Sequence, residues 1–213
     1  MNEIVIIGGG GHSKVIISIL KRLNEYEIVG YTDRYNNGDI LGIPYLGKDD
    51  YLESLIKKDV RFAVLGIGQL RNYKLRLEVS EYCQSLGYHF PTVVAPTALV
   101  TEDVQLDKGV VVMDGVIINP GTKIGAFSII NTRSSIDHDC RIGKYVHIAP
   151  GVTLSGSVTV KDFTLIGTGS SVIQNVVIEE RCVIGGGSAI IRNCNASRTY
   201  IGVPANRHTK KNK

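Results

Sequence analysis

A histidine between two carboxylates is the part of this chain best suited to acid–base chemistry. His138 stands between Asp137 and Asp139. A carboxylate that accepts a hydrogen bond from one imidazole nitrogen fixes the tautomer and makes the other nitrogen more basic. A histidine held in this way can act as a general base. The alternative is that His138 is a solvated surface histidine without a catalytic role.

The sequence around His138 repeats every six residues, and this period predicts its surroundings. From Val100 to Ile190 every sixth residue is aliphatic. A helix would repeat about every 3.6 residues and a simple strand about every 2, whereas a period of six is typical of the hexapeptide repeats of parallel β-helices. Three hexads form one triangular coil, so residues eighteen apart are expected to lie one above the other. Gly156 would then lie directly above His138 and offer a backbone N–H that could stabilise an oxyanion.

The coil leads to two further expectations about its packing. The four cysteines are expected to be structural thiols, because Cys140 and Cys182 point inward but are not separated by a multiple of eighteen residues. Four glycines directly follow an inward aliphatic residue, where a corner can need positive φ: Gly125, Gly143, Gly167 and Gly185.

The first part of the chain has a different pattern, in which apolar strands alternate with helices. Strands are expected at 3–7, 27–32, 61–65 and 89–94, and helices at 12–23, 49–57 and 69–86. This alternation predicts a parallel α/β sheet of Rossmann-like type. We expect two domains, an α/β domain at 1–95 and a β-helix at 96–213 that includes a C-terminal tail.

Ligands of parallel sheets bind beyond the carboxyl ends of the strands. The residues expected there are Gly10, Gly11, His12, Asp33, Arg34, Gly66 and Gly68. A glycine loop that opens a helix suits the phosphate of a mononucleotide or a nucleotide sugar. A nicotinamide dehydrogenase is disfavoured, because Ser13 stands where the dinucleotide fingerprint has its third glycine. The remaining alternative is that the glycines serve only a tight turn.

Composition limits the class of protein and its partners. The chain has 213 residues, of which 43% are hydrophobic and 21% charged, with a formal net charge of +4. No apolar run approaches a membrane span, and no basic leader precedes the first apolar stretch. We therefore expect a cytoplasmic protein with neither nucleic acid nor a membrane as partner. No metal site is expected, because His138 and His147 lie half a coil apart and cannot converge on one ion.

The repeat ends after Ile190, and the chain then carries Gly202, Val203, Pro204 and Ala205 with Arg207 close behind. This turn could hold the phosphate or adenine of a long ligand. Lys210 onward is expected to be a frayed basic tail.

Taken together, the motifs resemble the bacterial sugar O/N-acetyltransferases of the sialic-acid O-acetyltransferase group. This family contains UDP-4-amino-sugar and GDP-perosamine N-acetyltransferases. The motifs that carry the resemblance are Gly-Gly-Gly-His-Ser-Lys at 9–14, Asp33, Ser-Ile-Asp-His-Asp at 135–139, His147, Ile-Gly-Gly-Gly at 184–187 and Gly-Val-Pro-Ala at 202–205.

The resemblance implies a left-handed coil and specific roles for single residues. His138 would be the base and Asp139 the acid that raises its basicity. Relatives often have glutamate in place of Asp139, and aspartate has a shorter reach, so Asp137 is the alternative for the residue that orients the imidazole. The nucleotide sugar would bind at Gly10, Gly11, His12, Asp33 and Arg34, with Asn131 beside the sugar. Acetyl-CoA would bind between coils near His147, Thr168 and Gly186. The long ligand expected at the turn with Gly202 and Arg207 would then be the same cofactor.

The expected activity is therefore acetyl-CoA-dependent N-acetylation of the 4-amino group of a nucleotide-linked sugar, by direct transfer in a homotrimer. One alternative is O-acetylation of a sialic acid or a related hydroxyl. Another is a non-catalytic scaffold that binds a sugar nucleotide. The sequence leaves open whether the nucleotide is UDP, GDP or CMP.

Overall fold

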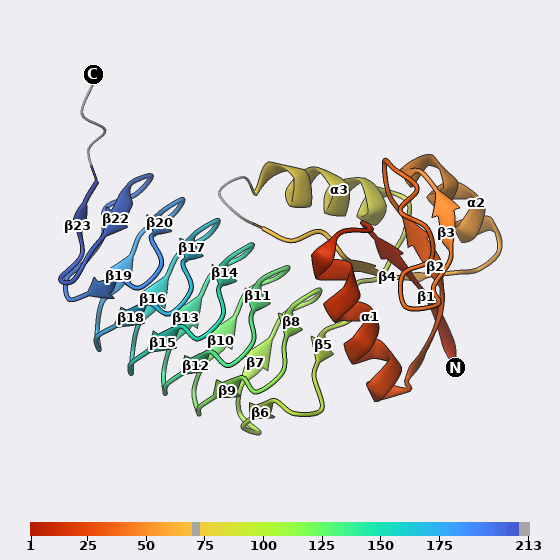
Figure 1. The fold of residues 1–213 in the computed structure, drawn as a ribbon. Coiled ribbons are helices and arrows are strands. Elements are labelled where there is room, and N and C mark those ends of the chain that lie inside the picture. Colours follow the sequence, from red (N-terminus) through yellow and green to blue (C-terminus); the bar gives the residue numbers. More distant parts are fainter. Residues whose placement is uncertain (70–72, 209–213) are drawn as a thin grey trace, which may run out of the picture. The chain divides into compact units, whose positions relative to one another are not determined.

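The computed structural model describes residues 1–69 and 73–208 of the chain. They form two compact units, which divide between Pro96 and Thr97 (Figure 1). The predicted boundary lies one residue earlier. The predicted basic tail from Lys210 lies outside the described residues.

The N-terminal unit contains a four-stranded parallel sheet in the order β3-β2-β1-β4. Its central strand β1 is apolar, and Ile4, Ile6 and Ile7 are fully buried in the core together with Ile16 and Leu20 of helix α1. The elements of this unit are β1 (Asn2–Ile7), α1 (Gly11–Leu23), β2 (Tyr26–Thr32), β3 (Tyr45–Gly47), a 3₁₀ turn (Asp49–Tyr51), α2 (Leu52–Lys57), β4 (Phe62–Leu65) and α3 (Lys74–Ser85).

The fourth strand predicted for this sheet, at 89–94, was wrong. Only His89 bridges to Phe62 of the sheet, while Val93–Val94 (β5) is an edge strand of a coil sheet. The sheet has β3 as its fourth strand instead, a segment of three residues that shows no alternating pattern. The helix predicted at 69–86 is α3, and residues 70–72 of that prediction lie outside the described residues.

The rest of the chain forms the predicted left-handed parallel β-helix (Figure 1). Its first face contains β5, β8, β11, β14, β17, β20, β22 and β23, its second face β6, β9, β12, β15, β18 and β21, and its third face β7, β10, β13, β16 and β19. The strands are β6 (Leu99–Val100), β7 (Gln105–Leu106), β8 (Val111–Val112), β9 (Ile117–Ile118), β10 (Lys123–Ile124), β11 (Ile129–Ile130), β12 (Ser135–Ile136), β13 (Arg141–Ile142), β14 (His147–Ile148), β15 (Thr153–Leu154), β16 (Thr159–Val160), β17 (Leu165–Ile166), β18 (Ser171–Val172), β19 (Val177–Ile178), β20 (Val183–Ile184), β21 (Ala189–Ile190), β22 (Thr199–Ile201) and β23 (Asn206–Arg207).

From β6 to β21 each strand of the coil pairs with the strand eighteen residues away, as the period predicts, whereas β22 pairs with β20 at a separation of sixteen residues. Ile136, for example, pairs with Ile118 on one side and Leu154 on the other. The inward aliphatic side chains stack in columns, and from Val112 to Ile190 they are almost fully buried. Two of the corners carry predicted site residues. The His138 corner comprises residues 137–139 and their equivalents every eighteen residues, and it joins the second face to the third. The Thr168 corner comprises residues 167–169 and their equivalents, and it joins the first face to the second.

The prediction of positive φ at Gly125, Gly143, Gly167 and Gly185 was wrong. Positive φ occurs two residues later in each corner, as at Phe127, Tyr145 and Gly169. The four glycines are required for another reason, because the next coil lies too close for a side chain. A Cβ at Gly125 would lie 2.7 Å from the carbonyl carbon of Gly143, and one at Gly167 would lie 2.6 Å from the nitrogen of Gly186.

Inward hydroxyl groups connect successive coils at several corners. Thr164 is fully buried, and its Oγ1 donates to the carbonyl of Glu179 at 3.0 Å and accepts the N–H of Cys182 at 3.3 Å. Thr122, Ser128 and Ser170 make the equivalent pair of bonds in other coils. Each hydroxyl thereby satisfies two buried backbone groups that the two-residue strands leave unpaired.

Replacing Thr164 by Val should lower the free energy of unfolding by about 1–3 kcal/mol, because both backbone groups would lose their partner in the interior. The control is Thr159→Val on the outer surface of β16, which should change it by less than about 0.5 kcal/mol. Urea denaturation followed by circular dichroism would measure both. Equal stability of the two variants would contradict a bridging role for the hydroxyl.

Candidate active site

His138 lies on a corner of the coil, in a turn shaped by its neighbours in the sequence. Strand β12 ends at Ile136, whose fully buried side chain points inward. Asp139 has a φ of 59°, a conformation that aspartate tolerates better than most residues. Its Oδ2 lies 2.8 Å from Nδ1 of His138, and the two side chains are 60% and 58% exposed. The turn therefore joins imidazole and carboxylate into a pair at the surface.

Asp137, the other flanking carboxylate, holds the backbone of the turn instead of the imidazole. Its Oδ1 accepts the backbone N–H of His138 at 2.8 Å and the side-chain amide of Asn119 at 3.1 Å. Asn119 occupies the same corner position one coil earlier. The two carboxylates thus have different partners, and Asp139 is the one that contacts the imidazole.

Both carboxylates favour the protonated form of His138. The hydrogen bond to Asp139 raises the pKa of His138 above its ordinary value, and the charge of Asp137 acts in the same direction. The pKa of Asp137 is lowered, first by the N–H of His138 and then by the amide of Asn119. Because Nδ1 is engaged with Asp139, Nε2 is the nitrogen available for proton transfer.

Gly156 lies against this nitrogen, as the eighteen-residue spacing predicts. A Cβ at Gly156 would lie 2.6 Å from Nε2 of His138. Any residue other than glycine at position 156 would therefore displace the imidazole. At equivalent positions, the N–H groups of Lys108 and Thr132 donate to the side chain of the preceding Asp or Asn. Gly156 follows a serine, and within the described parts of the chain its N–H makes no hydrogen bond. This N–H can therefore serve as a donor to a ligand.

Asn131 and His147 lie on the first face and its corner, away from His138. The resemblance implies a different ligand for each of them, but the structure brings them together, with Nδ2 of Asn131 3.1 Å from Nε2 of His147. His147 is 8% exposed. Thr168 and Gly186 are exposed on the Thr168 corner, where few side chains project beyond the backbone. Within one chain these four residues do not meet His138 and Gly156.

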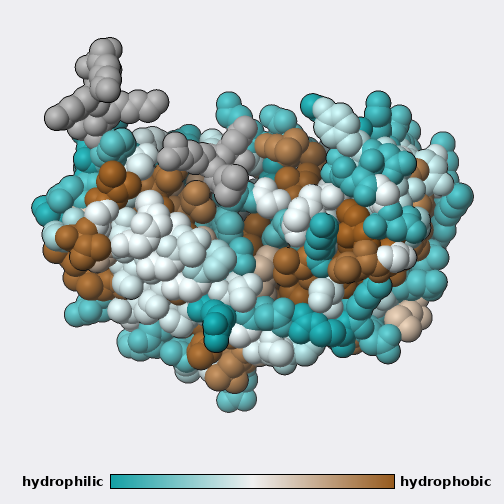
Figure 2. Space-filling model, in the orientation of Figure 1, coloured by the Kyte–Doolittle hydropathy of each residue, from teal (hydrophilic) through white to brown (hydrophobic). Residues whose placement is uncertain are grey.

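Gly202 and Arg207 belong to the C-terminal hairpin of β22 and β23 and are both exposed. Ile201 and Val203 beside them are 44% and 76% exposed. Figure 2 shows hydrophobic colouring at the end of the coil that holds β22 and β23. An apolar surface beside the guanidinium of Arg207 suits a flat aromatic group that carries phosphate.

The N-terminal unit contains a cavity of about 490 Å³ next to the glycine loop. Two of the predicted residues, Gly10 and Gly11, line it, and a Cβ at either would meet no atom within 4 Å. Packing therefore does not require glycine there, whereas a ligand close to the backbone would. The residues that sequence reasoning missed are Lys14, Asn37, Asp39, Ile40 and Leu41, together with Gly9. Lys14 could have been found from its place in the first turn of α1.

The other predicted residues near the loop do not line this cavity, and some have structural partners. The carboxylate of Asp33 accepts the N–H of Gly9 at 2.5 Å and that of Tyr35 at 3.0 Å, so it braces the loop. Gly66 is a packing glycine, since a Cβ there would lie 2.7 Å from the carbonyl oxygen of Gly8. Gly68 lies beside His12, and Arg34 is exposed.

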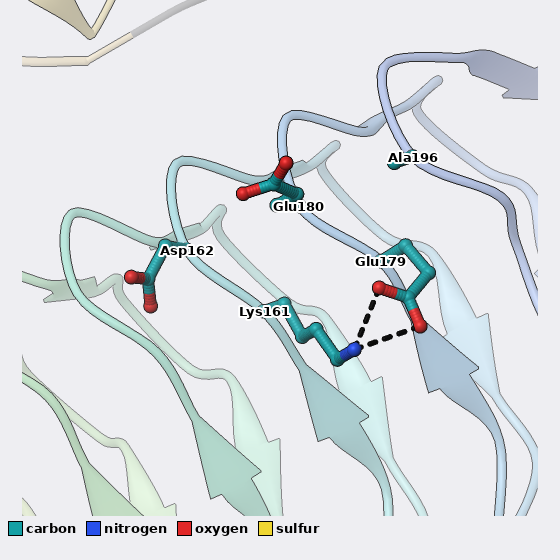
Figure 3. A pocket seen from close by; sticks show the side chains of 5 residues that line it. All are labelled: Lys161, Asp162, Glu179, Glu180 and Ala196. Carbon is teal, nitrogen blue, oxygen red and sulfur yellow. Dashed lines mark hydrogen bonds and ion pairs between the residues drawn. The ribbon is translucent and has the colours of Figure 1, made fainter.

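A second hollow, of about 290 Å³, lies on the coil between Lys161, Asp162, Glu179, Glu180 and Ala196 (Figure 3). Figure 3 shows Lys161 and Glu179 pointing toward one another from neighbouring coils, and the pair is 2.7 Å apart. Asp162 accepts the N–H of Lys144, and Glu180 pairs with Arg181. Each charged side chain that lines this hollow already has a partner in the protein, so the hollow is a weaker candidate than the glycine-loop cavity.

The four cysteines are buried and form no disulfide. Burial raises the pKa of Cys140 to about 11 and that of Cys194 to about 12, so these thiols stay protonated at neutral pH. The described residues contain no cluster of His, Cys, Asp and Glu that could hold a metal ion. Among the helices in the described part of the chain, none is long and apolar enough to cross a membrane.

The two units match two known protein families. Residues 3–83 match the PglD N-terminal domain family, and residues 123–156 match the bacterial transferase hexapeptide family. A β-helix of hexapeptide repeats that follows such an N-terminal domain defines the class as a hexapeptide-repeat transferase.

Full-length relatives define the family more closely. The perosamine N-acetyltransferase of Caulobacter crescentus, solved as a histidine-to-asparagine variant with CoA and GDP-perosamine, is 33% identical with a TM-score of 0.93 and covers 99% of this chain and 98% of its own. The acetyltransferase domain of PglB from Neisseria gonorrhoeae with acetyl coenzyme A is 29% identical with a TM-score of 0.91, covering 98% and 100%. The GDP-perosamine N-acetyltransferase of Escherichia coli O157:H7 is 29% identical over 76% of this chain and 74% of that protein.

The chain belongs to this family of hexapeptide-repeat sugar N-acetyltransferases, which confirms the resemblance seen in its motifs.

Proposed function

We propose that the protein transfers the acetyl group of acetyl-CoA to the 4-amino group of a nucleotide-linked sugar, with His138 as the general base. The observation that carries the proposal is the pair of His138 Nδ1 and Asp139 Oδ2 at 2.8 Å, with Gly156 against the other imidazole nitrogen. The names of the relatives support the amine as acceptor over the hydroxyl of a sialic acid. A non-catalytic scaffold would need neither the pair nor the glycine.

The reaction follows from this geometry. Nε2 of His138 removes a proton from the sugar amine as the nitrogen attacks the thioester carbonyl. The carbonyl oxygen gains negative charge and accepts a hydrogen bond from the N–H of Gly156. The tetrahedral intermediate collapses, the C–S bond breaks, and protonated His138 returns the proton to the thiolate of CoA. Asp139 accepts a hydrogen bond from Nδ1–H throughout, which fixes the tautomer of the neutral imidazole and stabilises the imidazolium.

The transfer is direct, without an acyl-enzyme. Cys140 is the cysteine nearest in sequence to His138, but it is fully buried and its pKa is raised to about 11. A nucleophilic thiol needs a lowered pKa and access to substrate. Ser134 is 1% exposed and donates its hydroxyl to the carbonyl of Asn131, so it has no base to activate it.

The nucleotide of the acceptor sugar binds the glycine-loop cavity. The open backbone of Gly10 and Gly11 at the start of α1 offers N–H groups to a diphosphate, and Lys14 adds a positive charge. Asp33 fixes the loop through Gly9. Relatives described with GDP-perosamine favour a guanosine diphosphate sugar. Both co-substrates are cytoplasmic metabolites, which supports a cytoplasmic enzyme, and cell fractionation tests this.

Acetyl-CoA binds along the Thr168 corner, where Thr168 and Gly186 offer a smooth backbone surface. The chain acts as a homotrimer, because the His138 corner and the Thr168 corner, which carry the proposed site, form the two edges of the second face. The second face presents Leu99 and Ile117, 60% and 42% exposed, whereas the third presents Lys123 and Arg141. Three coils with their second faces toward a threefold axis bring the His138 corner of one chain beside the Thr168 corner of the next.

Replacing His138 by Ala should lower kcat by about 10²–10⁴, the usual contribution of a positioned base. The KM for acetyl-CoA should change little, because the imidazole acts on the amine. The control is His89→Ala, an exposed histidine of the other unit, which should keep the wild-type rate. Turnover of GDP-perosamine and of a UDP-4-amino sugar, followed by release of free thiol, measures both. A His138→Ala protein with wild-type turnover would rule out the mechanism.

The division of ligands between the two units predicts a selective effect of Asp33→Ala. Loss of the carboxylate frees the Gly9 N–H and loosens the loop, so the KM for the nucleotide sugar should rise about tenfold, the loss of about 1.4 kcal/mol of binding. The KM for acetyl-CoA should stay unchanged. The control is Asp59→Ala, which removes an exposed carboxylate that pairs with Arg61. An equal rise of both KM values would contradict the division.

The trimer is tested by a charge on the second face. Ile117→Lys should dissociate the assembly and abolish turnover, because a buried unpaired ammonium is costly in an interface. Gln105→Lys adds the same charge to the third face and should leave both unchanged. Sedimentation velocity gives the mass. A fully active wild-type monomer would overturn the proposed assembly.

A further inference from the structure

Gly121 lies one coil before Asp139 and leaves the space that the carboxylate occupies. A Cβ at Gly121 would fall 2.5 Å from Oδ1 of Asp139 and 3.4 Å from its Cγ. The first of these distances is shorter than real Cβ contacts allow. The carboxylate whose Oδ2 contacts His138 therefore rests with its other oxygen over a glycine.

The shape of the corner does not by itself require glycine at this position. Gly121 has a φ of +74°, but Phe127, Arg133 and Tyr145 adopt positive φ at equivalent positions and carry large side chains. At Gly115, one corner earlier, a Cβ would lie 3.4 Å from Cγ of Arg133 and 4.0 Å from its Cα, which are ordinary van der Waals distances. The special requirement at Gly121 thus comes from the carboxylate above it.

The backbone of Gly121 is held from both sides. Its N–H donates to Oδ2 of Asp103 at 2.8 Å, and its carbonyl accepts from Nη1 of Arg141 at 2.5 Å. The neighbouring carbonyl of Pro120 accepts the N–H of Asp139 at 2.9 Å. The surface beneath the carboxylate is therefore rigid.

We propose that Gly121, held by Asp103, is a positioning residue that keeps the carboxylate of Asp139 on Nδ1 of His138. The proposal rests on the proposed function, in which that imidazole is the base. A side chain at Gly121 would push Oδ1 away and rotate the carboxylate off the imidazole. His138 would then lose its fixed tautomer and the main cause of its raised pKa, since Asp137 faces its backbone and acts only through charge.

The test is Gly121→Ala, with Gly115→Ala as the control that has the same backbone conformation but no carboxylate above it. The pKa of His138 is measured in the unliganded protein by NMR titration of its Cε1–H, assigned by its loss in His138→Ala. We expect the pKa to fall toward its ordinary value in Gly121→Ala and to match wild type in Gly115→Ala. The acid limb of kcat/KM should move to lower pH with it, and kcat should fall about 10–100-fold, the order expected of a misplaced catalytic group.

A double variant shows whether the effect passes through the carboxylate. Asp139→Asn should itself lower the pKa of His138, and in that background Gly121→Ala should add no further change in pKa or kcat. A folded Gly121→Ala protein with the wild-type His138 pKa would overturn the proposal, as would full additivity with Asp139→Asn. A lowered pKa with wild-type turnover would keep the positioning role and overturn His138 as the base.

If Gly121→Ala fails to fold, Asp103 provides the second test. Asp103→Ala removes the acceptor of the Gly121 N–H, whereas Asp103→Asn removes the same charge but keeps an acceptor oxygen. We expect a lower His138 pKa in the alanine variant than in the asparagine variant. Identical titrations would contradict the role of the held glycine.

Discussion

The stacking of each residue on the one eighteen positions later determines most contacts in the coil. Strands of two residues have little stability alone, so the buried aliphatic columns and the bonds between coils must hold the register. A slip by one residue would turn the aliphatic side chains outward. Each corner residue therefore has a defined neighbour above and below, and His138 meets Gly156, Asp137 meets Asn119, and Asp139 meets Gly121.

This regularity explains why much of the coil could be predicted from the sequence. The place of Gly156 beside His138 can be predicted by counting residues. Three hexads form one coil, so a residue lies beside the one eighteen positions later. The division of work between Asp137 and Asp139 does not follow, since it depends on side-chain rotation at a residue with positive φ. The prediction for Gly125 was wrong because glycine can be required for two reasons, a positive φ or a neighbouring backbone that leaves no room for a Cβ. The sequence does not distinguish these two reasons.

The N-terminal cavity was harder to predict because no period governs its loops. The glycine run and the helix start were evident, but Asn37 and Asp39 come from an irregular segment after β2. Asp33 follows the glycine loop at about the spacing of the carboxylate that binds ribose in dinucleotide-binding folds. Its carboxylate nevertheless accepts the backbone N–H groups of Gly9 and Tyr35. Within one glycine run, Gly9 is closed by the side chain of Tyr31 whereas Gly10 and Gly11 are open. Only three-dimensional contacts separate these cases.

An exposed histidine–carboxylate pair gains little from attraction alone, because water screens it and both side chains lose freedom. The proposed base must nevertheless stay accessible to a substrate as bulky as a nucleotide sugar. The coil allows the pair to be both exposed and oriented, because it fixes the backbone of the turn that carries His138 and Asp139. Asp137 holds the N–H of His138, Thr122 bonds the turn at the carbonyl of Asp137 and the N–H of Cys140, and the left-handed conformation of Asp139 directs its carboxylate. Rigidity of the turn thus supplies the orientation that burial supplies in enclosed active sites.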